Sequence, residues 1–172
     1  MTGYVALLRA VNVAGRKLLM KDLKAIADEL GLEGASTYIA SGNLLFASDK
    51  SEAALKGALE DRLAARLGAP VGVLVRTAAE MAAVARANPF DDRPGNRVVA
   101  IFLDKPPPKD AVDTAARLAN DEAIATGTRE IYVGYGKLGM GRSKMQVPAA
   151  AAGTARNMNT VAKLAELAKE KA

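Results

Sequence analysis

The order of hydrophobic periodicities along the first half of the chain is the feature that most restricts its fold. An uninterrupted apolar run at 4–8 is typical of a buried central strand, and apolar residues at helical spacing follow between 23 and 30. Two strand-like runs around a Ser-Gly turn, a second helical stripe and an alternating valine strand complete this half, at residues 37–39, 44–46, 55–67 and 71–75. This strand-helix-strand-strand-helix-strand order is the ferredoxin-like pattern.

A helix and a polar segment connect the two halves. Thr77 and Glu80 have the T-x-x-E spacing of a capping box at the start of an apolar helical face, and Asn88-Pro89 ends that helix. The segment 91–97 then combines charge, Pro and Gly without an apolar residue, which is typical of a domain boundary.

The second half repeats the beginning of the first. A buried strand is expected at 98–103, a helix from the prolines 106–108 through Leu118, and a strand pair at 123–125 and 131–135. An amphipathic helix that opens at 154–160 ends the chain.

We therefore predict an α+β protein of two ferredoxin-like, βαββα-type halves with antiparallel sheets, packed together. Residues 1–90 form the first half with its connecting helix, and residues 97–172 form the second half with the C-terminal helix.

The absence of histidine and cysteine removes most familiar active-site chemistry. Without histidine the chain lacks the usual general base near pH 7 and the commonest transition-metal ligand, so we expect no metal site and no cofactor, and the sequence names no catalytic residue. Lack of cysteine fits a reducing compartment, and no apolar stretch is long enough to span a membrane. We expect a cytoplasmic protein without membrane contact.

A net charge of +5 favours acidic partners such as nucleic acid, nucleotides or phosphorylated metabolites. An ordinary solvated surface explains the same charge. The chain has four Tyr, three Phe and no Trp, which disfavours a base-stacking platform for single strands. Nothing in the sequence indicates an oligomeric state.

The first candidate ligand-binding segment follows the first strand. It contains Arg9, Asn12, Gly15 and Arg16 where the chain leaves a buried strand and enters a helix, so backbone amides and basic side chains could hold an anion together. A simple connection in which Asn12 and Gly15 satisfy turn geometry is the alternative. For the shorter segment 41–43 a hairpin turn is the better interpretation.

The second candidate is the glycine-rich basic segment 136–144, which contains Arg142, Ser143 and Lys144. It nearly matches the phosphate-binding G-x-x-x-x-G-K-[ST] loop, but Arg142 occupies the lysine position and Pro148 interrupts any following helix. We reject nucleotide hydrolysis, and a flexible basic turn or an anion-binding turn remain as interpretations.

The third candidate lies at the start of the terminal helix and contains Arg156, Asn157 and Asn159. Asn157 is well suited to cap the helix, but capping requires neither Arg156 nor a second asparagine, so a polar binding site is the other interpretation. We expect the three candidate segments to lie close together in the fold.

Five ordered segments across nearly the whole chain resemble a bacterial family called "domain of unknown function 1697". These segments begin at Leu7-Leu8-Arg9, Thr37-Tyr38-Ile39, Asn88-Pro89-Phe90, Gly141-Arg142-Ser143-Lys144 and Arg156-Asn157. The resemblance implies tandem ferredoxin-like units and no established activity. Members usually have Trp between the two C-terminal asparagines, where this chain has Met158; the position serves either ligand stacking or packing, and Met suits packing.

These observations lead to two functional hypotheses of different class. The first is a binder of anionic ligands (nucleotide, phosphate or nucleic acid) that uses a cluster of basic loops. The alternative is an enzyme that acts on a small phosphorylated or carboxylated substrate without His or Cys. A purely structural interaction protein is a third interpretation.

We predict that the two halves unfold in a single calorimetric transition, because a half of fewer than about 90 residues has a small core of its own. Two well-separated transitions in a heating scan would contradict this.

Overall fold

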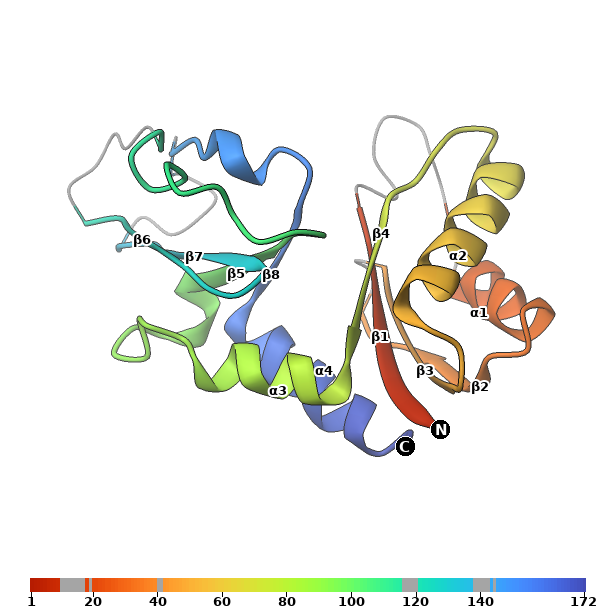
Figure 1. The fold of residues 1–172 in the computed structure, drawn as a ribbon. Helices are drawn as coiled ribbons and strands as arrows, with labels where there is room; N and C mark the ends of the chain where they lie inside the picture. Colours follow the sequence, from red (N-terminus) through yellow and green to blue (C-terminus); the bar gives the residue numbers. More distant parts are fainter. Residues whose placement is uncertain (10–17, 19, 40–41, 116–120, 138–142, 144) are drawn as a thin grey trace. The chain divides into compact units, whose positions relative to one another are not determined.

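The computed structural model describes residues 1–9, 18, 20–39, 42–115, 121–137, 143 and 145–172. Residue contacts divide the chain into two compact units, residues 1–81 with 164–172, and residues 82–163. Each unit contains one four-stranded antiparallel sheet (Figure 1). The predicted α+β class with two antiparallel, ferredoxin-like halves is confirmed.

In the first unit the elements follow one another in the order that the periodicities indicate. The first unit contains β1 (Thr2–Leu8), α1 (Met20–Glu29), β2 (Glu33–Thr37), β3 (Asn43–Ser48), α2 (Glu52–Leu67) and β4 (Val73–Thr77). The second contains the short 3-10 helix η1 (Gly95–Arg97), β5 (Val98–Phe102), β6 (Ala123–Thr126), β7 (Glu130–Gly134), the 3-10 helix η3 (Pro148–Ala150) and β8 (Thr154–Asn157). Helices α3 (Ala78–Arg86) and α4 (Met158–Lys169) each have residues in both units.

The first sheet has the strand order β2-β3-β1-β4, and α1 and α2 lie along one of its faces (Figure 1). Alternate residues of the central strands, such as Ala6 and Phe46, form one buried cluster with the apolar stripes of the two helices. On α2 the residues that enter this core are Leu55, Leu59 and Leu63, one turn apart, as the helical spacing predicts.

Local capping explains where α2 and α3 begin. The Ser51 side chain accepts a hydrogen bond from the Ala54 N–H at 3.2 Å, which satisfies one unpaired donor of α2. At α3 the predicted capping box is present: the Thr77 N–H donates to the Glu80 carboxylate at 2.9 Å, and the Glu80 N–H donates to the Thr77 hydroxyl at 3.1 Å.

The second sheet has the equivalent strand order, β6-β7-β5-β8. One face packs on the segments that connect β5 to β6 and β7 to β8, with Val99, Ile101 and Val133 in the shared core. On the opposite face the Tyr132 hydroxyl donates to the Val84 carbonyl of α3 at 2.9 Å. Burial, and then the Glu130 carboxylate, raise the pKa of Tyr132, so this phenol stays a donor at ordinary pH.

The sequence predicts a helix after the prolines 106–108, and this prediction is wrong over the described part of the segment. Residues 105–115 form irregular turns, held by bonds such as the Thr114 N–H to the Asp110 carbonyl at 2.9 Å. Three consecutive prolines remove backbone donors, and Asp, Val and Thr have low helix propensity, so a single turn forms without a helix.

The start of the terminal helix is also different from the expectation. Residues Thr154–Asn157 form strand β8, which pairs antiparallel with β5, and α4 begins at Met158. β8 gives the second unit the fourth strand that the pattern missed. Alternate residues Thr154 and Arg156 are buried while Ala155 is exposed, which is strand periodicity over a segment too short to indicate it.

The segment 38–43 forms the predicted hairpin connection between β2 and β3, although residues 40 and 41 lie outside the described part. Gly42 has a φ of 80°, which glycine adopts without steric cost. Asn43 is fully buried, and its side chain donates to the Tyr38 carbonyl at 3.0 Å. The polar side chain therefore holds the turn, in agreement with the structural interpretation of this segment.

Within the described residues, no helix combines the length and the apolar character that a membrane crossing requires.

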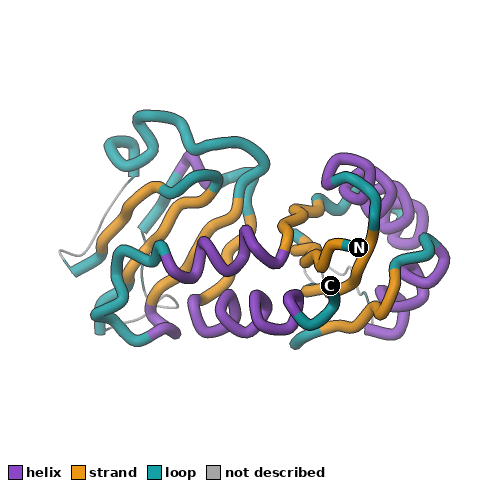
Figure 2. Tube along the Cα trace, turned by 60° about the horizontal axis from the view of Figure 1, so that its bottom comes forward, coloured by secondary structure: helices purple, strands orange, loops and turns teal. Residues whose placement is uncertain are grey.

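Both chain ends lie beside each other in the first unit (Figure 2). The last residues of α4 approach β1 so closely that a Cβ on Gly3 would lie 2.1 Å from the Ala168 carbonyl oxygen. The Lys171 ammonium also donates to the Gly34 carbonyl at 2.6 Å. Glycine at position 3 is therefore required for the end of α4 to dock on the first sheet.

Gly3→Ala should lower the free energy of unfolding by about 1–3 kcal/mol or more, because the obstructing atom is backbone and cannot rotate away. Gly57→Ala is the matched control: Gly57 is exposed inside α2, nothing lies within 4 Å of its added Cβ, and the change should stabilise by about 0.5–1 kcal/mol. Urea denaturation measures both. Equal effects of the two substitutions would contradict the docking contact.

Candidate functional site

The register of the second sheet gathers four chain segments at one end, which we call the pocket end. Val98 of β5 and Ala123 of β6 both pair with Gly134 of β7, and Asn157 of β8 pairs with Val99. The starts of β5 and β6 and the ends of β7 and β8 therefore lie together. The segments that flank these strand ends are 93–97, 121–122, 135–137 and 158–159.

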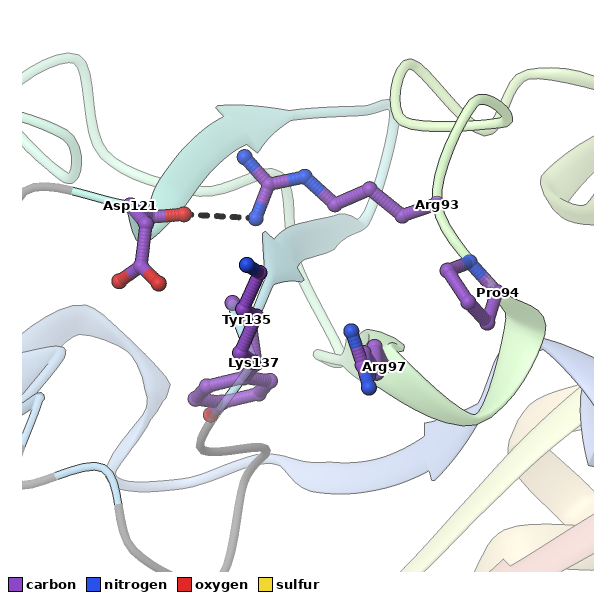
Figure 3. Close-up of a pocket in the computed structure, with 7 residues that line it drawn as sticks. Arg93, Pro94, Arg97, Asp121, Tyr135 and Lys137 are labelled. Atoms are coloured by element: carbon purple, nitrogen blue, oxygen red, sulfur yellow. Dashed lines mark hydrogen bonds between the residues drawn. The ribbon is translucent and has the colours of Figure 1, made fainter.

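A pocket of about 290 Å³ lies at this end of the sheet (Figure 3). Its lining residues come from the segments before β5, before β6 and after β7. They are Arg93, Pro94, Arg97, Asp121, Tyr135, Gly136 and Lys137.

Arg93 fixes one wall of the pocket. Its Nη1 donates to the backbone carbonyl of Asp121 at 2.7 Å, and this bond joins the segments before β5 and β6 (Figure 3). The guanidinium carbon lies 5.7 Å from the centre of the Phe90 ring, a cation–π distance. Because Gly134 has no side chain, the Arg93 stem passes directly over β7. Arg93 is thus a structural part of the pocket as well as a charge.

Arg97 and Lys137 supply two further positive charges. The Tyr135 N–H donates to the Arg97 carbonyl at 2.7 Å, which extends the β5–β7 pairing beyond the two strands. The side chains of Arg97 and Lys137 both line the pocket (Figure 3). Neither Arg97 nor Lys137 has an ion-pair partner among the described residues. The lining therefore has three cations and one carboxylate, that of Asp121.

The Asp121 carboxylate rests on Gly136. A Cβ on Gly136 would lie 1.7 Å from Asp121 Oδ2, so glycine is needed for the carboxylate to occupy this position. Asp121 is exposed, and it leaves most of the positive charge at the pocket uncompensated.

A buried polar group lies next to the pocket. Glu122 is only 8% exposed, and its Oε1 accepts a hydrogen bond from the Ser143 hydroxyl, which in turn accepts from the Met145 N–H at 3.2 Å. Burial first, and the Glu122 carboxylate second, raise the pKa of Tyr135 above its ordinary value. Ser143 therefore takes part in a contact at the pocket end, in the segment that the sequence singled out.

The predicted site residues are distributed over both units. Arg9 lies in the first unit at the end of β1, where its N–H donates to the Gly72 carbonyl at 2.9 Å and its side chain packs over Gly72. Arg156 and Asn159 lie in the second unit. Asn12, Gly15, Arg16, Arg142 and Lys144 lie outside the described residues. The expected convergence of the three segments stays a prediction.

Arg156 is buried within β8, opposite Ala100 of β5. Its Nη1 donates to the Thr154 hydroxyl at 2.8 Å and to the Ala155 carbonyl at 2.9 Å. Burial lowers the pKa of Arg156 to about 10. These bonds give Arg156 a structural role in the strand.

The two asparagines at the start of α4 have different surroundings. The Asn157 Oδ1 accepts from the Thr160 N–H at 2.9 Å, so the capping interpretation is confirmed. Asn159 is exposed, and its side chain lies over Gly95 of η1, next to the pocket wall. Met158 between them is 6% exposed, which favours packing as the role of this position.

The sequence reasoning missed Arg93, Arg97, Asp121 and Tyr135. Arg93 and Arg97 belong to the segment 91–97, whose charge and Pro-Gly content indicated only a boundary. The available signal was its pair of arginines directly before a buried strand, because loops at strand ends are where binding groups are commonly placed. Lys137 lies inside the glycine-rich segment 136–144 that the sequence did identify.

Comparison with known proteins identifies the family. The model of the family described as "Protein of unknown function (DUF1697)" matches residues 1–132, most of the chain. The chain belongs to this family. The DUF1697 resemblance seen in the sequence motifs is thereby confirmed.

A solved structure has the same fold over its full length. It is that of the conserved bacterial protein SP0830 from Streptococcus pneumoniae, with 26% sequence identity and a TM-score of 0.79 over 97% of this chain and 98% of that chain. A comparison with curated proteins gave no match.

Asn157→Ala should lower the free energy of unfolding by about 1 kcal/mol, because the Thr160 N–H loses its cap. Asn159→Ala, an exposed neighbour of the same type, should change it by less than about 0.5 kcal/mol. Chemical denaturation of both variants measures the difference. A neutral Asn157→Ala would show that water replaces the cap without loss.

Proposed function

We propose that this DUF1697 protein binds a small anionic molecule, with phosphate or carboxylate groups, in the pocket at the end of its second sheet. The observation that supports this most directly is the convergence of Arg93, Arg97 and Lys137 on one pocket that contains a single lining carboxylate. Positive side chains without carboxylate partners are stabilised when an anion neutralises them, and arginine forks match phosphate and carboxylate oxygens well.

The geometry favours a small molecule over nucleic acid. A nucleic-acid surface needs basic side chains spread along a face, and often aromatic rings for bases, whereas here the charges surround one pocket of about 290 Å³. This volume is near the lower end of ligand pockets, which run from about 300 to 1,000 Å³. A nucleoside would fill it, and a phosphorylated or carboxylated metabolite fits it more easily.

The three cations have different roles in the proposal. Arg93 is held by the Asp121 carbonyl and the Phe90 ring, so it presents a fixed charge. Arg97 and Lys137 have no such partners among the described residues and supply direct contacts to the anion. The cytoplasmic location expected from the sequence agrees with a metabolite ligand and stays a prediction.

Inorganic phosphate and simple phosphate esters should raise the melting temperature of the wild type and bind in titration calorimetry. Arg97→Ala should weaken binding about tenfold or more, because a hydrogen bond to a charged group contributes about 1.5–3 kcal/mol and a tenfold change is about 1.4 kcal/mol.

Arg129→Ala is the matched control. Arg129 lies in the β6–β7 turn at the opposite end of the same sheet, and its removal changes the net charge equally. Affinity should stay within about twofold, since a distant surface charge is largely screened. Equal losses in Arg97→Ala and Arg129→Ala would reduce the binding to general electrostatics and contradict the pocket.

A further inference from the structure

One oxygen of the Glu122 carboxylate has no hydrogen-bond partner among the described residues. Oε1 is bound by the Ser143 hydroxyl, while Oε2 is buried and has no hydrogen-bond partner among the described residues. Buried carboxylate oxygens almost always have a partner, because removing one from water without a hydrogen bond is costly. An oxygen of this kind therefore calls for a donor that comes from outside the described chain.

Glu122 is not one of the residues that line the pocket, but the register places it next to two residues that are. Ala123 pairs with Gly134, so one step further along the two strands Glu122 lies opposite Tyr135, on the sheet face that carries Ile124 and Val133. Asp121, the preceding residue, and Tyr135, the opposite one, both line the pocket. The effect of the Glu122 charge on the Tyr135 phenol agrees with this closeness.

We propose that the ligand of this pocket carries a hydrogen-bond donor, a hydroxyl or an amine, which binds Glu122 Oε2 while its anionic group binds Arg97 and Lys137. The inference rests on the proposed anion binding and narrows the ligand class to hydroxylated or aminated phosphates and carboxylates. Glu122 would then select among anions that the three cations alone accept equally.

Three compounds of equal size test the selection: propyl phosphate, 2-hydroxyethyl phosphate and phosphoethanolamine, which end in a methyl, a hydroxyl and an ammonium group. Titration calorimetry with the wild type should show the two donor-bearing compounds binding about tenfold or more tightly than propyl phosphate, the effect of one hydrogen bond to a charged acceptor.

Two variants assign the selection to Glu122. Glu122→Gln keeps an oxygen for Ser143 but places an amide N–H donor at the second position, which a ligand donor cannot bind. The preference should therefore fall below about twofold while propyl phosphate binds as before. Asp104→Asn removes an exposed carboxylate at the opposite end of the same sheet and should leave the preference intact.

The outcomes separate this inference from the function on which it rests. Equal binding of all three compounds to the wild type, or a preference that Asp104→Asn abolishes and Glu122→Gln keeps, would overturn the role of Glu122 and leave anion binding in place. Failure of all three to bind would overturn both. If the Glu122→Gln protein does not fold, the three wild-type titrations still test the inference, because equal binding of the three compounds contradicts it.

Discussion

Pairing of a central strand with an antiparallel neighbour on each side is the interaction on which each unit depends. β1 lies between β3 and β4, and β5 lies between β7 and β8. Both central strands are almost entirely buried, so their backbone groups must find partners within the sheet. That pairing determines which strand ends coincide, and hence which loops can share a site.

In both sheets a buried polar residue occupies the same position in the register and binds the preceding turn. Asn43 begins β3 opposite Leu7, and Glu130 begins β7 opposite Phe102. Each is buried and binds the backbone of its own hairpin: Asn43 donates to the Tyr38 carbonyl, and Glu130 accepts from the N–H groups of residues 128 and 129. A polar residue at the start of the third strand thus holds the turn in both units, with opposite hydrogen-bond polarity.

The edge strands repeat a second feature. Buried Arg76 lies opposite Val5, and buried Arg156 lies opposite Ala100. Each guanidinium donates to the carbonyl of the residue before it. Leu7 and Phe102 occupy equivalent positions in the two central strands, and so do Val5 and Ala100, two residues earlier. The two arginines that pair with Val5 and Ala100 are therefore equivalent as well. Direct residue identity between the halves is weak, so only the pairing pattern makes this correspondence visible.

Sequence alone predicted the features that local chemistry determines, such as the buried strand at 4–8 and the capping box of Thr77 and Glu80. It missed β8, because four residues with a buried arginine give no hydrophobic signal, and it placed a helix where prolines and β-branched residues form turns. The pocket could not be predicted from the sequence for a different reason. Arg97 and Lys137 are 40 residues apart along the chain, and the register of β5 and β7 brings them together.

The two ends of the second sheet differ in how many of their polar groups have hydrogen-bond or ion-pair partners, and this difference supports the proposed ligand pocket. At the end away from the pocket, Glu130 binds the hairpin N–H groups and the Arg129 guanidinium donates to the Asp104 carbonyl at 3.3 Å. The Leu103 N–H donates to the Arg129 carbonyl at 2.9 Å, which closes the same end. At the pocket end, Arg97, Lys137 and Glu122 Oε2 lack such partners among the described residues. Since a buried carboxylate oxygen without a hydrogen bond is costly and the two cations attract an anion, the proposed ligand with an anionic group and a donor would satisfy all three groups.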